Sequence, residues 1–227
     1  MKPTITLREL NISILTSRIN CPISFDLKYL KMEGIISPDW TLSQIPVKTE
    51  DFTQFIFTNG IRVILRPNIV TFAEPLKSFL IEKVKVISLV FNYIKNPSVF
   101  PSYKILFNIR SYVAFNSSNK SLPSQYISSL LKPGKWLEYG EEEVRATLNF
   151  VYHLEPVQLT INIKEAELQL PNAIIIPSVL FSGKYLFNLK ESSVKKHFHN
   201  LKTATSYWER SIENYRLIVE EVFIRVP

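Results

Sequence analysis

The residues best suited to ligand chemistry are basic side chains within predicted β-strands. Arg62 and Arg66 lie on one side of a strand, opposite to Val63 and Leu65. A sheet face carrying such cations could contact a phosphate backbone. It could equally be the ordinary solvated face of an antiparallel sheet. The candidate polyanion contacts are Arg62, Arg66, Lys104, Arg110 and Arg145.

The three histidines show no metal-ligand spacing. His197 and His199 stand two apart, so on a helix they point in different directions. Neither cysteine nor carboxylates stand near them at ligand spacing. His153 lies beside Glu155 near a strand end, where it is either a half-exposed turn residue or a general base. The sequence therefore predicts no metal site and no specific catalytic residue.

Other reactive groups also lack visible partners. Cys21, the only cysteine, precedes Pro22 with no histidine nearby, which indicates an inert thiol. Glu165 and Glu167 share a strand face and could form a carboxylate pair, although nothing marks them for glycoside chemistry. Phosphate-binding loops, dinucleotide fingerprints and nucleophile elbows do not occur. We predict no cofactor, and the sequence leans away from an enzyme.

Composition indicates a globular, basic protein. The chain has 227 residues, 46% hydrophobic, with a net charge of +7. Residues 1–102 carry 12 basic and 8 acidic residues, and residues 103–227 carry 15 and 12, so the surplus is spread evenly. The N-terminus has no signal-peptide pattern and no apolar run is long enough to span a membrane. With one cysteine, these features predict a cytoplasmic protein with no membrane association.

Hydrophobic periodicity predicts strands followed by a helix in the first half. Asn59-Gly60 is a hairpin signal of the type I′ kind. The stretch 22–36 fits either a short helix or a strand. The predicted elements are strands Glu9–Ser17, Phe52–Thr58, Ile61–Arg66 and Ile69–Ala73, and a helix Lys77–Lys95.

The second half shows a similar order. Ser121 or Ser124 could cap its short helix. A last helix, Ser193–Ile224, carries an apolar stripe from Val194 to Val222 that would pack on the sheet or form a coiled-coil seam. The other predicted elements are strands Tyr103–Phe115, Val144–Leu154, Val157–Ile163 and Glu165–Leu170, a helix Leu122–Leu131, and a strand or hairpin over 173–189.

A tryptophan and a proline of the first half recur at the same spacing in the second half. Trp40 and Trp136 are 96 residues apart, as are Pro75 and Pro171, with strand, turn and strand between each pair. The positions predicted to face inward, odd or even, switch near Asn68 and again 96 residues later. We therefore predict one α+β domain over 1–227, built from two similar halves, about 5–99 and 103–227. These would form one curved antiparallel sheet with helices on one face and a long C-terminal helix.

This order of elements resembles the duplicated TATA-binding-protein-like fold. The chain is also similar to a sporadically distributed family of uncharacterised bacterial proteins. The first resemblance implies two halves joined in one curved sheet. It brings no DNA-contacting residue to this sequence, because no motif of that family is readable here.

Three functions follow as hypotheses. The first is a non-catalytic interaction or scaffold protein that binds a partner protein or itself through a sheet face or the last helix. The second is nucleic-acid binding across the basic sheet face, weakened because Gln158 and Asn162 stand where Arg62 and Arg66 stand in the first half. The third is an enzyme or small-ligand carrier with a pocket between sheet and helices.

Overall fold

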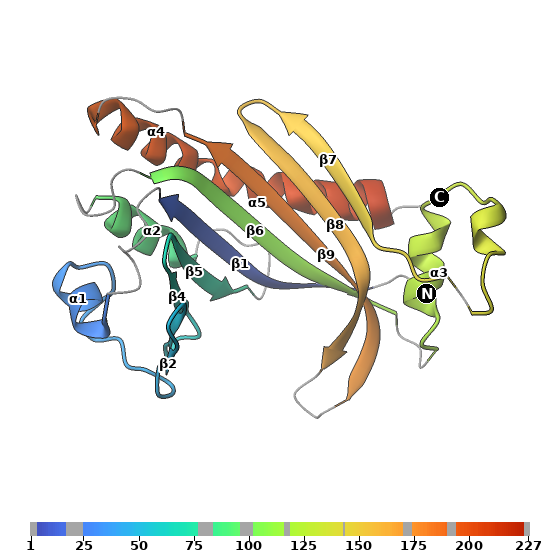
Figure 1. Ribbon diagram of the computed structural model, residues 1–227, viewed down its shortest axis with the longest axis horizontal. Coiled ribbons are helices and arrows are strands. Elements are labelled where there is room, and N and C mark those ends of the chain that lie inside the picture. Colours follow the sequence, from blue (N-terminus) through green and yellow to red (C-terminus); the bar gives the residue numbers. More distant parts are fainter. Residues whose placement is uncertain are drawn as a thin grey trace.

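One antiparallel sheet organises the molecule (Figure 1). The computed structural model describes residues 4–16, 25–76, 84–95, 102–115, 119–142, 144–169, 174–189 and 194–224. In these ranges nine strands pair in the order β2-β3-β4-β5-β1-β6-β9-β8-β7. The strands are β1 Thr4–Thr16, β2 Val47–Lys48, β3 Thr53–Ile56, β4 Arg62–Arg66, β5 Ile69–Pro75, β6 Ser102–Ala114, β7 Leu148–Leu154, β8 Val157–Gln169 and β9 Ile175–Asn188.

The neighbouring central strands β1 and β6, of 13 residues each, join the halves of the sheet. Leu10, Ile12 and Ile14 of β1 are fully buried on one face, and their partners on β6 are equally apolar. β1 begins earlier than the predicted Glu9–Ser17, at Thr4. A bulge between Leu7 and Glu9 explains the difference, because it shifts the alternation of the first residues out of phase with the rest.

The predicted meander of the first half is confirmed as β3, β4 and β5. Its hairpin differs from the predicted type I′ turn. Phe57 and Ile61 close a three-residue loop, in which the N–H of Phe57 donates to the carbonyl of Ile61. Gly60 takes a φ of +85°, as the last residue of such loops requires, and the Asn59 side chain accepts from the N–H of Ile61.

The ambiguous stretch 22–36 contains a short helix, α1 (Leu27–Met32). Asp26 caps it by accepting a hydrogen bond from the N–H of Tyr29 at 2.7 Å. In the described residues the predicted helix 77–95 appears as α2, which spans Val86–Ile94; Val84 and Lys85 are not helical, and residues 77–83 lie outside the described part. A carboxylate oxygen of Glu74 accepts from the N–H of Val86 at 2.7 Å, so β5 supplies the cap of α2.

The second half begins as predicted, with β6 followed by α3 (Leu122–Ser129). A 3₁₀ turn that was not predicted, η3 (Lys135–Leu137), comes next. Neither proposed serine caps α3. Ser121 makes no side-chain cap, and the hydroxyl of Ser124 donates to the carbonyl of Val144. Residues 144–147 belong to no strand, so the strand predicted from Val144 begins at Leu148.

The predicted separate strand over 165–170 is wrong. β8 continues without a register shift to Gln169, paired along its length with the single strand β9, and Leu170 and Pro171 lie outside the described residues. No turn therefore corresponds to Pro67-Asn68 of the first half. The apparent parity switch near Lys164 lies within one strand, where burial alternates differently after Ile163.

The C-terminal region is one bent helical run and not a single regular helix. It comprises α4 (Val194–Ser206), α5 (Trp208–Leu217) and a π-helix, η4 (Ile218–Ile224). The wider π turn changes which side chain faces inward. Phe223 is buried, whereas Val222, which the heptad pattern placed in the apolar stripe, is 61% exposed.

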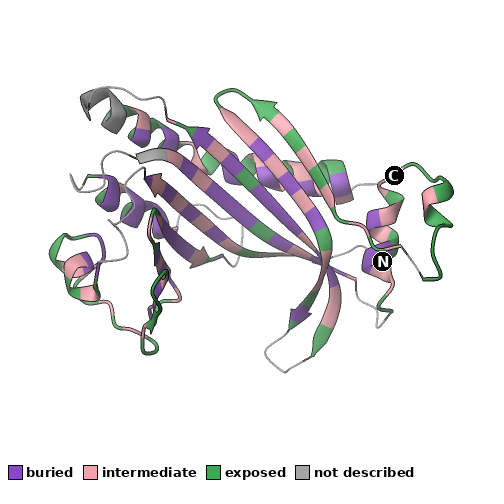
Figure 2. Cartoon of the chain, viewed as in Figure 1, coloured by how far each residue is buried: buried purple, intermediate pink, exposed green. Residues whose placement is uncertain are grey.

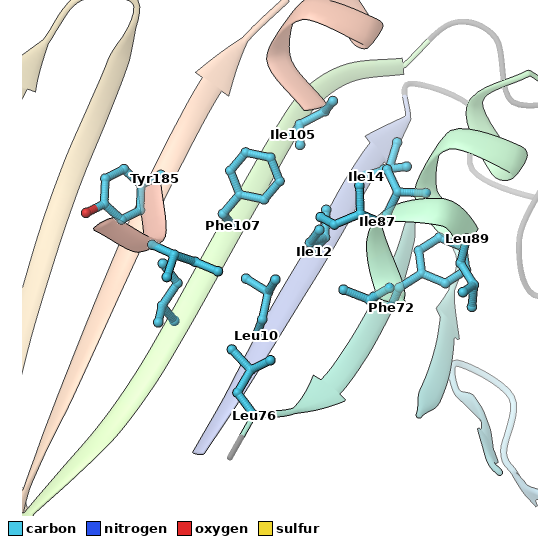
Figure 3. Packing of buried hydrophobic residues seen from close by; sticks show 14 of the residues in the cluster. Leu10, Ile12, Ile14, Phe72, Leu76, Ile87, Leu89, Ile105, Phe107 and Tyr185 are labelled. Atoms are coloured by element: carbon cyan, nitrogen blue, oxygen red, sulfur yellow. The ribbon is translucent and has the colours of Figure 1, made fainter. Parts of the chain in front are cut away.

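Helices cover one face of the sheet and confirm the α+β prediction. Figure 1 shows α5 passing behind the strands, and Figure 2 shows buried positions alternating along them. The fully buried Tyr215 of α5 shares a hydrogen bond with Ser111 at 2.7 Å and donates to the carbonyl of Phe181. The buried stripe thus packs on its own sheet, while the side chains of Val194 and Phe198 lie outside the described part. Figure 3 shows this core, with Leu10, Ile12, Ile14, Phe72, Leu76, Ile87, Leu89, Ile105, Phe107 and Tyr185 labelled.

The halves share a strand order, in which the first strand of each lies beside its last: β1 beside β5, and β6 beside β9. The two tryptophan anchors differ in surroundings. Trp40 packs edge-on against Phe57, whereas Trp136 lies in η3 and donates to the carbonyl of Lys132. The internal duplication therefore stays a prediction.

Candidate functional site

The sheet face opposite the helices, hereafter the open face, is the candidate site. Strand register assigns its residues, because side chains alternate between the two faces. On β1 the buried Leu10, Ile12 and Ile14 face the helices, so Glu9, Asn11 and Ser13 belong to the open face. The aromatic contacts made by α2 and α3, such as Tyr93 with Phe72, reach the helix-covered face.

Four of the five predicted cations belong to the open face. Arg62 and Arg66 alternate with the fully buried Val63 and Leu65 on β4. On β6, Lys104 and Arg110 alternate with buried Ile105 and Ile109. The register places Lys104 opposite Leu15 and Arg110 opposite Glu9 on β1. Arg145 differs: it is exposed, but it precedes β7 and pairs with no strand.

Three further cations that sequence reasoning missed join this face. Lys184 of β9 stands opposite Asn108 on one side and Thr160 on the other, and it is exposed. Lys164 of β8 is exposed too and stands opposite Leu180. Arg8, the extra residue of the β1 bulge, places its guanidinium 5.8 Å from the ring centre of Tyr112.

Glu9 is the one carboxylate on the open face within the described paired strands. It forms ion pairs with Arg62 and with Arg110, the latter at 3.1 Å. The N–H₂ group of Asn11 also donates to it at 2.8 Å. The Glu9 side chain is only 15% exposed, whereas those of Arg62 and Arg110 are 33% and 44% exposed. Glu9 thus holds two arginines in place, and both arginine side chains stay partly exposed.

Short polar side chains fill the middle of the face. Ser182 donates to the Asn108 side chain at 2.8 Å, and the hydroxyls of Ser13 and Thr71 lie 2.8 Å apart. The side-chain oxygen of Asn11 is buried and has no hydrogen-bond partner. Asn11 and Asn108 are directly opposite each other across β1 and β6. The residues around Asn11 and Asn108 are therefore polar, and they lie among cations and the leucines Leu106, Leu180 and Leu186 of the same face.

Aromatic side chains are scarce on this surface. In the described paired strands Tyr112 is the one aromatic residue with open-face parity, and Arg8 lies over its ring. Proteins that bind single strands present successive aromatic platforms for stacking bases. The open face is thus suited to phosphates more than to exposed bases.

The candidate acid and base residues do not form a site. His153 and Glu155 are exposed at the tip of the β7–β8 hairpin. Glu165 and Glu167 pair with β9, and one carboxylate oxygen of Glu165 is buried without a partner. His199 is exposed on α4, while Cys21 and the side chain of His197 lie outside the described residues.

A pocket of about 640 Å³ lies between the 34–40 loop and α2. Its walls include Ile35, Pro38, Trp40, Lys85 and Leu89. None of the residues predicted for catalysis lines it. This cavity therefore does not support the third hypothesis, in which a pocket is built around His153 or the Glu165 and Glu167 pair.

The described residues contain neither a metal-binding cluster nor a helix that could span a membrane. No cluster of three or more His, Cys, Asp or Glu side chains there is arranged to hold a metal ion. No helix in the described ranges combines the length and apolar character needed to cross a membrane.

The comparisons with known proteins add no relative to this picture. No protein-family model matches the chain, and no curated protein matches it.

Proposed function

We propose that the open face binds the phosphate backbone of a nucleic-acid duplex without reading its sequence. The observation that carries the proposal is the charge of this face. In the described paired strands seven cations share this face with one carboxylate, that of Glu9; the cations are Arg8, Arg62, Arg66, Lys104, Arg110, Lys164 and Lys184. Such a surface attracts polyanions by releasing their counterions.

The dimensions of the face agree with a duplex. Nine strands spaced by about 4.8 Å span roughly 38 Å across the sheet. One turn of B-form DNA measures about 34 to 36 Å. The cations lie on the six strands from β4 to β8, which span roughly 24 Å, so they could follow a backbone for about two thirds of a helical turn.

The scarcity of open-face aromatics favours backbone contact over base stacking. Backbone contacts position a protein on nucleic acid without conferring sequence preference. The interaction hypothesis through the last helix loses support by comparison, because Leu201, Ile212 and Val219 of the apolar stripe are buried.

Fluorescence anisotropy with a duplex of about 20 base pairs, or two turns, tests the proposal. The test variant is Lys164→Glu/Lys184→Glu, which reverses two exposed open-face charges. Its matched control is Lys28→Glu/Lys202→Glu, because these exposed lysines lie on helices α1 and α4. Both variants change the net charge equally.

We expect wild type and the control variant to bind at low salt and the open-face variant to bind at least about tenfold more weakly. Equal weakening of both variants would mean that only net charge matters, and the open face would lose its role. Absence of wild-type binding at low salt would remove the proposal altogether.

A further inference from the structure

Strand β7 ends the sheet with an unprotected edge. Within the described residues its inner side pairs with β8, and no strand pairs with its outer side. Edge strands are usually protected by charge, proline, bulges or short length. β7 has seven residues, no charged side chain, no proline and an unbroken register. At the opposite end of the sheet, β2 has only two residues, one of them Lys48.

The side chains of β7 are more exposed than their apolar character suggests. No residue of this strand is buried, and Val151 and Leu154 are 52% and 37% exposed. The ring centres of Phe150 and Phe223 of η4 lie 5.2 Å apart, so the strand itself is anchored to the core. The edge is therefore anchored to the core, and apolar or aromatic side chains stand at all of its positions except Asn149 and His153.

We infer that β7 pairs antiparallel with β7 of a second copy of this chain, about a two-fold axis at Val151. In this register Phe150 faces the partner's Tyr152, and Leu148 faces the partner's Leu154, on the helix-covered side. Val151 meets the partner's Val151 on the open-face side. Apolar and aromatic cross-strand pairs of this kind stabilise antiparallel sheets.

The order of residues in β7 is what selects a second copy as the partner. About a two-fold axis at Val151 each apolar residue faces an apolar residue, and Asn149 faces the partner's His153. No Asp, Glu, Lys or Arg side chain belongs to this strand, so the edge is complementary to itself.

Pairing in this way would join two sheets into one and double the open face. The inference does not depend on nucleic-acid binding, since it rests on the edge of the sheet and not on its face. The oligomeric state and the affinity for DNA can therefore fail or hold separately.

Sedimentation velocity over a concentration series tests the inference. Val151→Lys adds a charge at the centre of the edge, and Val222→Lys is the matched control at a valine 61% exposed on η4. We expect wild type and Val222→Lys to form dimers as concentration rises and Val151→Lys to stay monomeric. A wild type that stays monomeric throughout, or a Val151→Lys variant that dimerises like wild type, would overturn the inference.

Disulfide trapping gives a second test that does not depend on the folding of the lysine variant. In a Cys21→Ser background, Val151→Cys would place two sulfurs across the axis, with Cα atoms about 4.5 to 5.5 Å apart. Asn149→Cys would stand about 13 Å from its equivalent. We expect rapid oxidation to a dimer only for Val151→Cys. Equal trapping of both variants, or of neither, would contradict the register.

Discussion

Because Gly183 of β9 has no side chain, the ring of Tyr215 can pack directly against its backbone. A Cβ atom at position 183 would stand 2.5 Å from Cδ2 of Tyr215, closer than any side-chain contact allows. The ring is fully buried, and burial raises the pKa of the Tyr215 hydroxyl, so the phenol stays protonated as a donor to the Phe181 carbonyl. One glycine thus fixes how closely α5 approaches the sheet.

We predict that Gly183→Ala lowers the free energy of unfolding by about 1 to 3 kcal/mol, because the overpacked ring must move. Urea denaturation measures the change. In a Tyr215→Leu background the same substitution should cost less, since the ring that it meets is gone. An equal cost in both backgrounds would show that Gly183 matters for another reason.

The π-helix makes a prediction about two neighbouring residues. Phe223→Ala should destabilise the protein by about 3 to 5 kcal/mol, because it empties a buried site beside Phe150 and Phe181. Val222→Ala should change stability by less than about 0.5 kcal/mol, since that side chain is exposed. Thermal or urea unfolding of the two variants compares them, and the reverse order would contradict the π-helical register.

Glu74 predicts a pH dependence of stability. Burial raises the pKa of its carboxyl above the ordinary 4.5, although the hydrogen bond from Val86 N–H opposes this shift. Because the folded state holds the proton more tightly, the contribution of Glu74 is fully present below 4.5 and is lost as pH rises through the raised value. In Glu74→Gln the stability should therefore change less across this interval than in wild type. Urea midpoints as a function of pH measure it, and parallel curves would count against this assignment.

Glu9 should restrain polyanion binding, because its carboxylate pairs with both Arg62 and Arg110. We expect Glu9→Gln to bind duplex DNA more tightly and with a steeper salt dependence, by about 1 for each arginine that then engages a phosphate. A titration by anisotropy beside Glu33→Gln, an exposed carboxylate at the end of α1, separates this from the loss of one negative charge. Equal gains in both variants would mean that Glu9 has no local effect.

Much of the fold follows from alternation in the sequence. The strands β3, β4, β5 and β6 stand close to their predicted positions, because each alternates regularly between turn signals. The bulge at Arg8 and the continuous β8 were missed, since neither leaves a turn residue behind. The predicted boundary between two strands near Lys164 relied on a switch in the apolar pattern, which a strand also shows where it extends past its core.

The candidate site was predictable only in part. Strand parity identified Arg62 and Arg66, because their neighbours are apolar. Lys184 could not be assigned to a face from the sequence, because 173–189 fits either a strand or a hairpin and the register with β6 connects residues 76 apart. Alternation within Val179, Phe181, Tyr185 and Phe187 was the available signal. Pairing between Glu9 and Arg110 is a long-range contact that no local pattern encodes.

The salt dependence of duplex binding tests the central claim most directly. The logarithm of the binding constant should fall linearly with the logarithm of salt concentration. The slope should become less steep by about 1 in Lys184→Gln and stay unchanged in Lys202→Gln. A slope near zero in wild type, or the same slope in all three proteins, would contradict phosphate binding on the open face.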